Sequence, residues 1–117
     1  MIVSKWFAID ELKCKCGCSL YIKNQELLDV LDDVRDYFGV PVTVTSSTRC
    51  KVHNREVGGS ENSQHLLGKA CDIQVLGISP EDVASYLEDE YVSRYGIGEY
   101  NTFTHIDVRS LKARWYG

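Results

Sequence analysis

The stretch SQHLLGKACDI, residues 63–73, leads from a polar segment into an apolar one and carries His65 and Asp72 seven positions apart. The overlapping run KACDIQVLG, residues 69–77, is mostly apolar and has a glycine at each side. Such a run, bounded by turn residues, predicts a β-strand. The strand is central to the fold, because whatever covers its apolar face must form the core.

Side chains alternate between the two faces of a strand. One face of the predicted strand is apolar and should meet the helices: Cys71, Ile73 and Val75. The other face carries a carboxylate where a site could form, and its residues are Ala70, Asp72 and Gln74. His65 and Asp72 are therefore either a polar interruption before a buried strand or two ligands of a metal.

Two helices and three further strands are predicted around this strand. Apolar residues recur at helical spacing over residues 25–38, with Asn24 as the N-cap and Gly39 just past the end. Ser79 and the proline after it begin a second helix that runs to about residue 92. The predicted strands are residues 40–46, 96–100 and 102–109, with a short helical turn around 51–56. Residues 1–22 are predicted to be irregular, and the tail 111–117 is short, with no element assigned to it.

This order of elements predicts an α+β fold with one small, mostly antiparallel sheet and helices packed on one face. The 117 residues suit a single domain, 1–117, and we expect a monomer. The net charge of −4 argues against nucleic acid as a partner. No apolar run approaches the ~20 residues that span a bilayer, so membrane insertion is not expected. The N-terminus lacks the features of a signal peptide, which predicts a protein made in the cytoplasm.

Five cysteines are present, and three of them cluster in KCKCGCS as Cys14, Cys16 and Cys18. Structural zinc sites usually use pairs spaced C-x2–4-C, so reduced packing or turn residues are the favoured interpretation of this cluster. Cys71 is predicted to be buried on the apolar strand face. Cys50 could bond to the cluster if the protein reaches an oxidising space.

The predicted strand 102–109 brings a second pair of polar side chains together. Alternation places Phe103, His105 and Asp107 on one face, so an imidazole and a carboxylate project together. A catalytic zinc site uses three ligands from His, Asp, Glu or Cys and leaves one position for water. That set of ligands is matched by His65, Asp72 and His105. Asp107 is then an additional acid next to the metal site. The spacing alone is weak, because a lone histidine is more often a surface or structural residue.

Several segments, in order and with consistent spacing, resemble the zinc D-Ala-D-Ala carboxypeptidase family, which shares a fold with lysostaphin-type enzymes and the hedgehog signalling domain. SQHLLGKACDI resembles its S-x-H-x2-G-x-A-x-D signature, and TSSTR, ending at Arg49, resembles its S-G-Y-R segment. HNREVGG resembles the stretch between the two. GIGEYNTFTHIDVR, followed by Trp115, resembles the closing segment, and LKCKCGC resembles the N-terminal region of short phage members.

Carried over by position, the resemblance implies a zinc ion bound by His65, Asp72 and His105. Arg49 would hold substrate or polarise the scissile carbonyl, a role that suits a guanidinium fork. The resemblance also implies that Ser63 and Trp115 bind substrate. His53 lies in the linking motif and is not implied to be a ligand.

The chain also departs from the family pattern. Some branches place an acid or histidine two or three positions before the last histidine as the base, where this chain has Phe103 and Thr102. Asp107 is the preferred candidate, as general base or as orienter of His105, and Glu99 is the second. A purely structural ion pair between Asp107 and Arg109 remains open. Ser47 and Thr48 replace the glycine and tyrosine of S-G-Y-R, which leaves pocket shape and substrate preference open.

Together these features predict a zinc metallopeptidase that hydrolyses amide bonds in peptidoglycan stem or cross-link peptides, as a carboxypeptidase or an endopeptidase. Without a signal peptide, a phage product is expected, either an endolysin released through a holin or a virion-associated lysin. Two alternatives remain: a non-catalytic zinc-containing module that binds the cell wall, and a cysteine-cluster metal or redox protein.

Overall fold

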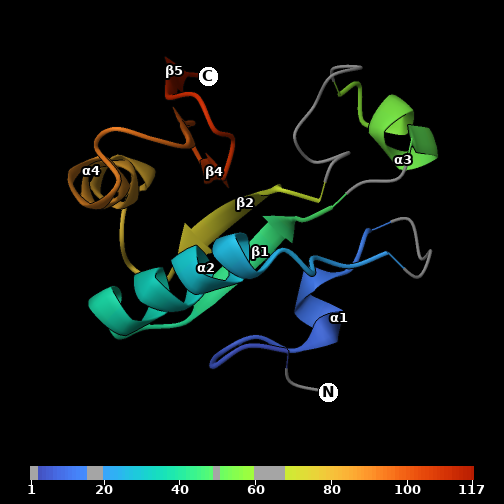
Figure 1. Cartoon of the computed structure of the whole chain (residues 1–117), viewed down its shortest axis with the longest axis horizontal. Coiled ribbons are helices and arrows are strands. Elements are labelled where there is room, and N and C mark those ends of the chain that lie inside the picture. Colours follow the sequence, from blue (N-terminus) through green and yellow to red (C-terminus); the bar gives the residue numbers. More distant parts are fainter. Residues whose placement is uncertain (1–2, 16–19, 49–50, 60–67) are drawn as a thin grey trace.

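The computed structural model describes residues 3–15, 20–48, 51–59 and 68–117, and Figure 1 shows its helices and strands. The helices are α1 (Ile9–Leu12), α2 (Gln25–Phe38), α3 (Lys51–Glu56) and α4 (Pro80–Glu90). The strands are β1 (Val42–Ser46), β2 (Ala70–Val75), β3 (Gly96–Glu99), β4 (Thr104–Asp107) and β5 (Ala113–Tyr116).

Both long helices begin at their predicted caps, and α2 also ends at its predicted one, whereas α4 ends at Glu90, slightly before the expected residue 92. The Asn24 side chain accepts a hydrogen bond from the Leu27 amide at 2.9 Å, and Gly39 ends α2 in the left-handed conformation. Ser79 caps α4 in the same way, with Pro80 at the first helical position. Both helices are amphipathic, so each presents one apolar stripe for packing.

The sheet has five strands in the order β1-β2-β4-β3-β5. The pairs β1–β2, β2–β4 and β3–β4 are antiparallel, whereas β3 and β5 run parallel. The sheet is therefore a five-stranded mixed sheet, and the expectation of a small, mostly antiparallel one is corrected. The difference arises at the C-terminus, where no strand is predicted and the tail returns to pair with β3.

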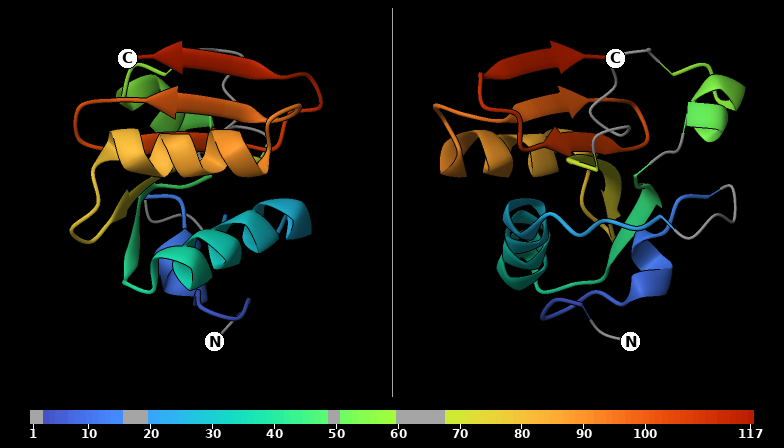
Figure 2. Two further views of the ribbon diagram at one scale, coloured as in Figure 1. Left: turned by 90° about the vertical axis from the view of Figure 1, so that its left-hand side faces the viewer. Right: turned by 45° about the vertical axis from the view of Figure 1, so that its right-hand side comes forward.

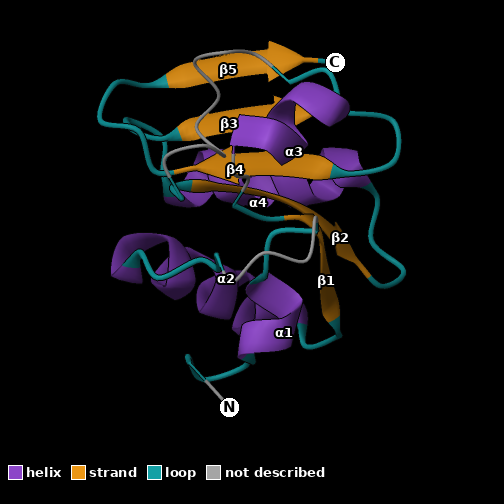
Figure 3. Cartoon of the chain, turned by 90° about the vertical axis from the view of Figure 1, so that its right-hand side faces the viewer, coloured by secondary structure: helices purple, strands orange, loops and turns teal. Residues whose placement is uncertain are grey.

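Helices α2 and α4 cover the apolar face of the sheet. Cys71, Ile73 and Val75 of β2 are buried there with the apolar stripes of both helices, as the alternation of β2 predicts. The Thr104 hydroxyl donates to the Pro80 carbonyl at 3.1 Å and ties β4 to the start of α4. Figures 2 and 3 show α4 on one side of the sheet and α3 on the other. The second face of the sheet is thus left for a site.

Two elements were not predicted, and both are short. Helix α1 has four residues, and β5 has four residues that are half-buried or exposed. Neither carries enough apolar periodicity to stand out in the sequence. No helix in the described ranges has the length and apolar character needed to cross a membrane.

Candidate metal centre

The pairing of β2 with β4 brings Asp72 opposite His105, although they are far apart in the sequence. The Asp72 Oδ1 and His105 Nδ1 atoms are 2.9 Å apart. Both residues are nearly buried, with exposed fractions of 7% and 8%. A carboxylate and an imidazole held this close offer an oxygen and a nitrogen donor to one ion. The structure thus joins two of the three predicted ligands.

Asp107 lies on the other side of the same imidazole ring. Its Oδ2 atom is 2.8 Å from His105 Nε2, and its side chain is fully buried. Arg109 donates to the same carboxylate twice, from Nε to Oδ1 at 2.7 Å and from Nη2 to Oδ2 at 2.6 Å. The Arg109 amide donates to Oδ1 as well, at 3.2 Å. Both carboxylate oxygens are therefore occupied by protein donors.

These contacts set the protonation of the pair. Burial by itself raises the pKa of Asp107, but hydrogen bonds from His105 and Arg109 lower that pKa well below its ordinary value. Burial works against charge on His105, yet the carboxylates of Asp107 and Asp72 outweigh it and raise the pKa of His105. Asp107 is thus an ionised acceptor that fixes one ring nitrogen of His105, leaving the other directed at Asp72.

Two glycines of β3 make room for this site. The register places Gly96 beside Asp107 and Gly98 beside His105, on the same face. A Cβ at Gly96 would lie under 3.0 Å from the Asp107 carboxylate and Arg109 Nε, and a Cβ at Gly98 would overlap the Trp115 indole. Neither glycine has a positive φ, so space rather than backbone conformation requires them.

An aromatic group borders the site on its outer side. The Trp115 ring lies 5.0 Å from the His105 ring, with the Arg109 guanidinium 5.2 Å from the indole centroid. The Trp115 indole N–H donates to the Tyr100 hydroxyl at 2.9 Å, and Tyr100 stacks on Phe103 at 4.4 Å. The structure therefore places Trp115 against a predicted ligand. Tyr100 was missed as a neighbour of the site, although it follows Gly98 on the same strand face.

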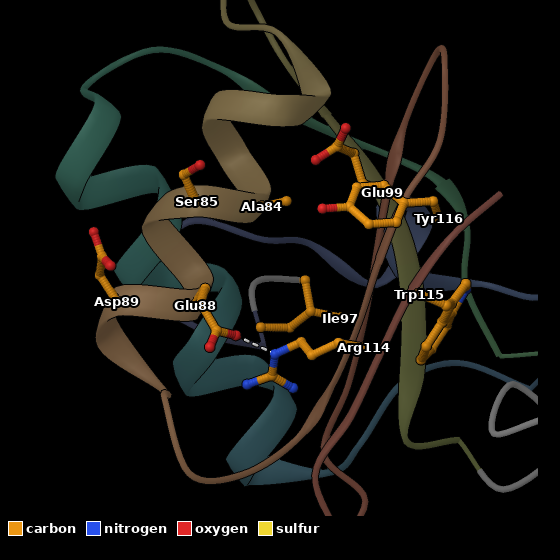
Figure 4. Close-up of a pocket in the computed structure, with 9 residues that line it drawn as sticks. All are labelled: Ala84, Ser85, Glu88, Asp89, Ile97, Glu99, Arg114, Trp115 and Tyr116. Carbon is orange, nitrogen blue, oxygen red and sulfur yellow. Dashed lines mark hydrogen bonds and ion pairs between the residues drawn. The ribbon is translucent and has the colours of Figure 1, made fainter.

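Glu99 faces the other side of the sheet. Figure 4 shows a pocket between α4 and the strands β3 and β5, into which Glu99 and Arg114 project, with Trp115 on the far side of its strand. Alternation explains this, because Glu99 is one residue from Gly98 and pairs with Thr104, a residue of the helix-covered face. The sheet therefore separates Glu99 from the Asp72–His105 pair.

Three predicted site residues, Arg49, Ser63 and His65, lie outside the described residues, as do Cys16, Cys18 and Cys50. Within the described ranges, no group of three His, Cys, Asp or Glu residues is arranged to hold a metal. The described residues supply one oxygen and one nitrogen donor, a combination that fits zinc and leaves a third ligand to come from elsewhere. Asp107 at the second ring nitrogen matches the outer carboxylate that commonly accompanies a metal-bound histidine.

The two described cysteines are buried in the molecule. Cys71 is fully buried on the helix-covered face of β2, and burial raises the pKa of its thiol well above the usual value. The neighbouring carboxylates of Asp72 and Asp107 raise it further. Cys71 is therefore an unreactive core residue, as predicted. Cys14 is buried as well.

Comparison with models of protein families places this chain in a known family. The family model described as peptidase M15 matches residues 5–107 of this chain. The matched region contains β2, β3 and β4, and so includes Asp72, His105 and Asp107. No curated protein matches the sequence.

Proposed function

The chain belongs to the peptidase M15 family, whose members are metallopeptidases, and we propose that it is a zinc-dependent peptidase acting on peptidoglycan peptides. The bonds it hydrolyses would be amide bonds of stem or cross-link peptides. Zinc would be held by Asp72, His105 and His65. As a source, we propose a phage: an endolysin released through a holin, or a lysin carried by the virion.

One observation carries this proposal. Asp72 and His105 come from different strands and meet at 2.9 Å in a nearly buried position, inside the region that matches the family. Burying a carboxylate and an imidazole is unfavourable unless they are paired or coordinate a metal. Asp107, itself held by Arg109, is hydrogen-bonded to the second ring nitrogen of His105. A carboxylate at this position commonly orients a metal-binding histidine.

The contacts around His105 support a separate role for each residue of the proposed site. Zinc supplies Lewis acidity toward water and toward a carbonyl oxygen. With Nδ1 bound to the metal, Asp107 would accept the Nε2 hydrogen of His105 and so hold the ring in that tautomer. We therefore propose Asp107 as the orienter of His105 rather than as the general base, because its oxygens are already occupied. Glu99 is unsuited to that role because it lies across the sheet.

The remaining roles follow the resemblance. We propose that Arg49 stabilises the developing oxyanion and holds substrate, and that Ser63 binds the substrate's end. Trp115, half-buried beside His105, would provide an apolar wall for the peptide. The protein would act as a monomer on the wall after synthesis in the cytoplasm.

The decisive experiment is digestion of purified peptidoglycan of several cross-link types by zinc-loaded protein. New amino groups should appear, and mass spectrometry of the muropeptides would identify the bond. His105→Ala and Asp72→Ala should abolish this release. The matched control is His53→Ala, since the resemblance gives His53 no ligand role, and it should retain activity.

Two outcomes would contradict the proposal. If zinc-loaded protein releases no amino groups from any wall type but still binds the wall, the non-catalytic binding module becomes the better description. If His65→Ala leaves the zinc content unchanged, the metal sits elsewhere, and the cysteine cluster around Cys14 is the next place to test.

A further inference from the structure

The two neighbouring residues Arg114 and Trp115 of β5 face opposite sides of the sheet. In the parallel register with β3, Arg114 pairs with Ile97 and Trp115 with Gly98. Ile97 belongs to the helix-covered core, whereas Gly98 adjoins His105. Figure 4 shows the two side chains on opposite sides of their strand. The position of Trp115 over the site therefore depends on how firmly β5 is held from the other face.

Arg114 uses all five of its N–H donors. Nε donates to the Glu88 carboxylate of α4. Nη1 donates to the carbonyls of Tyr95 at 2.6 Å and Ala113 at 2.8 Å. Nη2 donates to the carbonyls of Tyr91 at 2.9 Å and Arg94 at 3.0 Å. A guanidinium has five such donors, so this one side chain joins α4, the connection to β3 and β5.

Little else anchors β5 on that face. Its four residues are half-buried or exposed, and Tyr116 is 85% exposed. At the edge of the sheet the strand pairs with β3 on one side, with further backbone bonds from Ala113 to Tyr95 and from Gly117 to Glu99. A short edge strand with so little buried apolar surface is weakly held by packing. The Arg114 contacts are its main side-chain attachment to α4.

We propose that Arg114 is a positioning residue for the metal centre, which acts through Trp115. By fixing β5 against α4, it holds the indole beside His105 and over Gly98. The indole then covers the outer side of the His105 ring and of the Asp107–Arg109 pair behind it. This inference rests on the proposed role of His105 as a ligand, but it adds a residue from the opposite face of the sheet.

The first test observes Trp115 directly in the zinc-free protein. In a nitrogen–proton correlation spectrum, Arg114→Met should move the Trp115 indole signal toward the position of a solvent-exposed indole, and should shift the His105 ring signals. Arg114→Lys should do the same, because a lysine can reach Glu88 but not four carbonyls as well. The control is Lys112→Met, which removes the other cation near Glu88, 3.6 Å away, and should leave both sets of signals unchanged.

The second test separates positioning from general stability. Arg114→Lys and Trp115→Phe should each weaken zinc binding by roughly 10-fold. This is the lower end of the losses in metal affinity seen when the surroundings of a ligand are changed. The double variant should be no weaker than Trp115→Phe alone, because Arg114 acts through the indole.

Unchanged indole and His105 signals in both Arg114 variants would overturn the inference, as would effects on zinc affinity that multiply in the double variant. The signals of the zinc-free protein do not depend on hydrolysis. A protein that cleaves no wall peptide would thus refute the proposed function while leaving the test of Arg114 intact.

Discussion

At the scale of single residues, Asp107 shows how burial changes a role that spacing suggests. Its position two residues after His105 is compatible with a base beside a metal or with an orienting carboxylate. The side chain is fully buried and accepts from His105 and three Arg109 donors. A general base must reach the proton that it removes, and these contacts leave Asp107 facing the imidazole instead.

Asp107→Asn should therefore weaken zinc binding rather than act on hydrolysis alone. The amide cannot supply the negative charge that the His105 ring and Arg109 face, and losing such a partner typically costs about 10–100-fold in metal affinity. Competition with a chromophoric chelator measures this loss. Asp82→Asn, in the exposed first turn of α4, is the control. Unchanged zinc affinity, together with lost turnover, would instead support Asp107 as the base.

Gly98 is the second residue whose neighbours decide its role. Its ideal Cβ would overlap the Trp115 ring, so Gly98→Ala should displace the indole. Overpacking of this kind costs roughly 1–3 kcal/mol of unfolding free energy. Urea denaturation measures the loss, and the tryptophan fluorescence reports the displacement. The same loss in a Trp115→Leu background would contradict the steric explanation, because the overlapping ring is then gone.

At the scale of elements, the site depends on pairing between strands that helices hold in place. β2 and β4 each contribute one donor, and their register brings Asp72 and His105 together. β3 adds glycines, and β5 adds the indole. The helices act from the other face: α4 through Thr104 and Arg114, and α2 through Glu26, whose carboxylate accepts from the Tyr95 hydroxyl at 2.7 Å.

The Tyr95–Glu26 contact predicts a pH dependence. Burial and the Glu26 carboxylate raise the pKa of Tyr95 to about 12, from an ordinary 10.0. The unfolded chain then loses this proton before the folded chain does. The contribution of this contact to the free energy of unfolding is thus complete below pH 10.0 and is lost as pH rises toward about 12. Denaturant unfolding across this range should show stability falling faster in the wild type than in Tyr95→Phe. Tyr116→Phe, at an exposed position, is the control, and equal slopes in all three proteins would contradict the prediction.

At the scale of the whole molecule, a metal at this position would connect segments that are distant in the sequence. The two proposed ligands that the structure describes, Asp72 and His105, come from β2 and β4, and the proposed third ligand, His65, precedes β2. A ligand that binds only the folded chain adds stability by mass action. Metal occupancy should therefore be visible in global unfolding and not only in turnover.

Zinc at 100 times its dissociation constant should add about 2.7 kcal/mol to the free energy of unfolding, which raises the melting temperature by roughly 10 °C or more. Thermal unfolding with and without a chelator measures this shift. His105→Ala and His65→Ala should lose it, whereas His53→Ala should keep it. A shift that persists in His105→Ala would place the stabilising metal at another site.

Elements that depend on local patterns can be predicted from the amino-acid sequence. The caps at Asn24 and Ser79 and the apolar stripes predict α2 and α4, and alternation predicts which face of β2 packs against the helices. The spacing of histidines and carboxylates, with the family resemblance, predicts Asp72 and His105 as metal ligands without any knowledge of the strand pairing. These features could be read because helix and strand periodicity are properties of neighbouring residues.

Contacts between distant segments, in contrast, follow from the folded structure. It turned the C-terminal tail into β5, in parallel with β3, and so made the sheet mixed. Glu99 lies across the sheet from the site. Asp107 is hydrogen-bonded to Arg109 and His105, and the Trp115 indole packs over Gly98. Strand register, burial and the choice of hydrogen-bond partners are set by long-range packing, which no local pattern encodes.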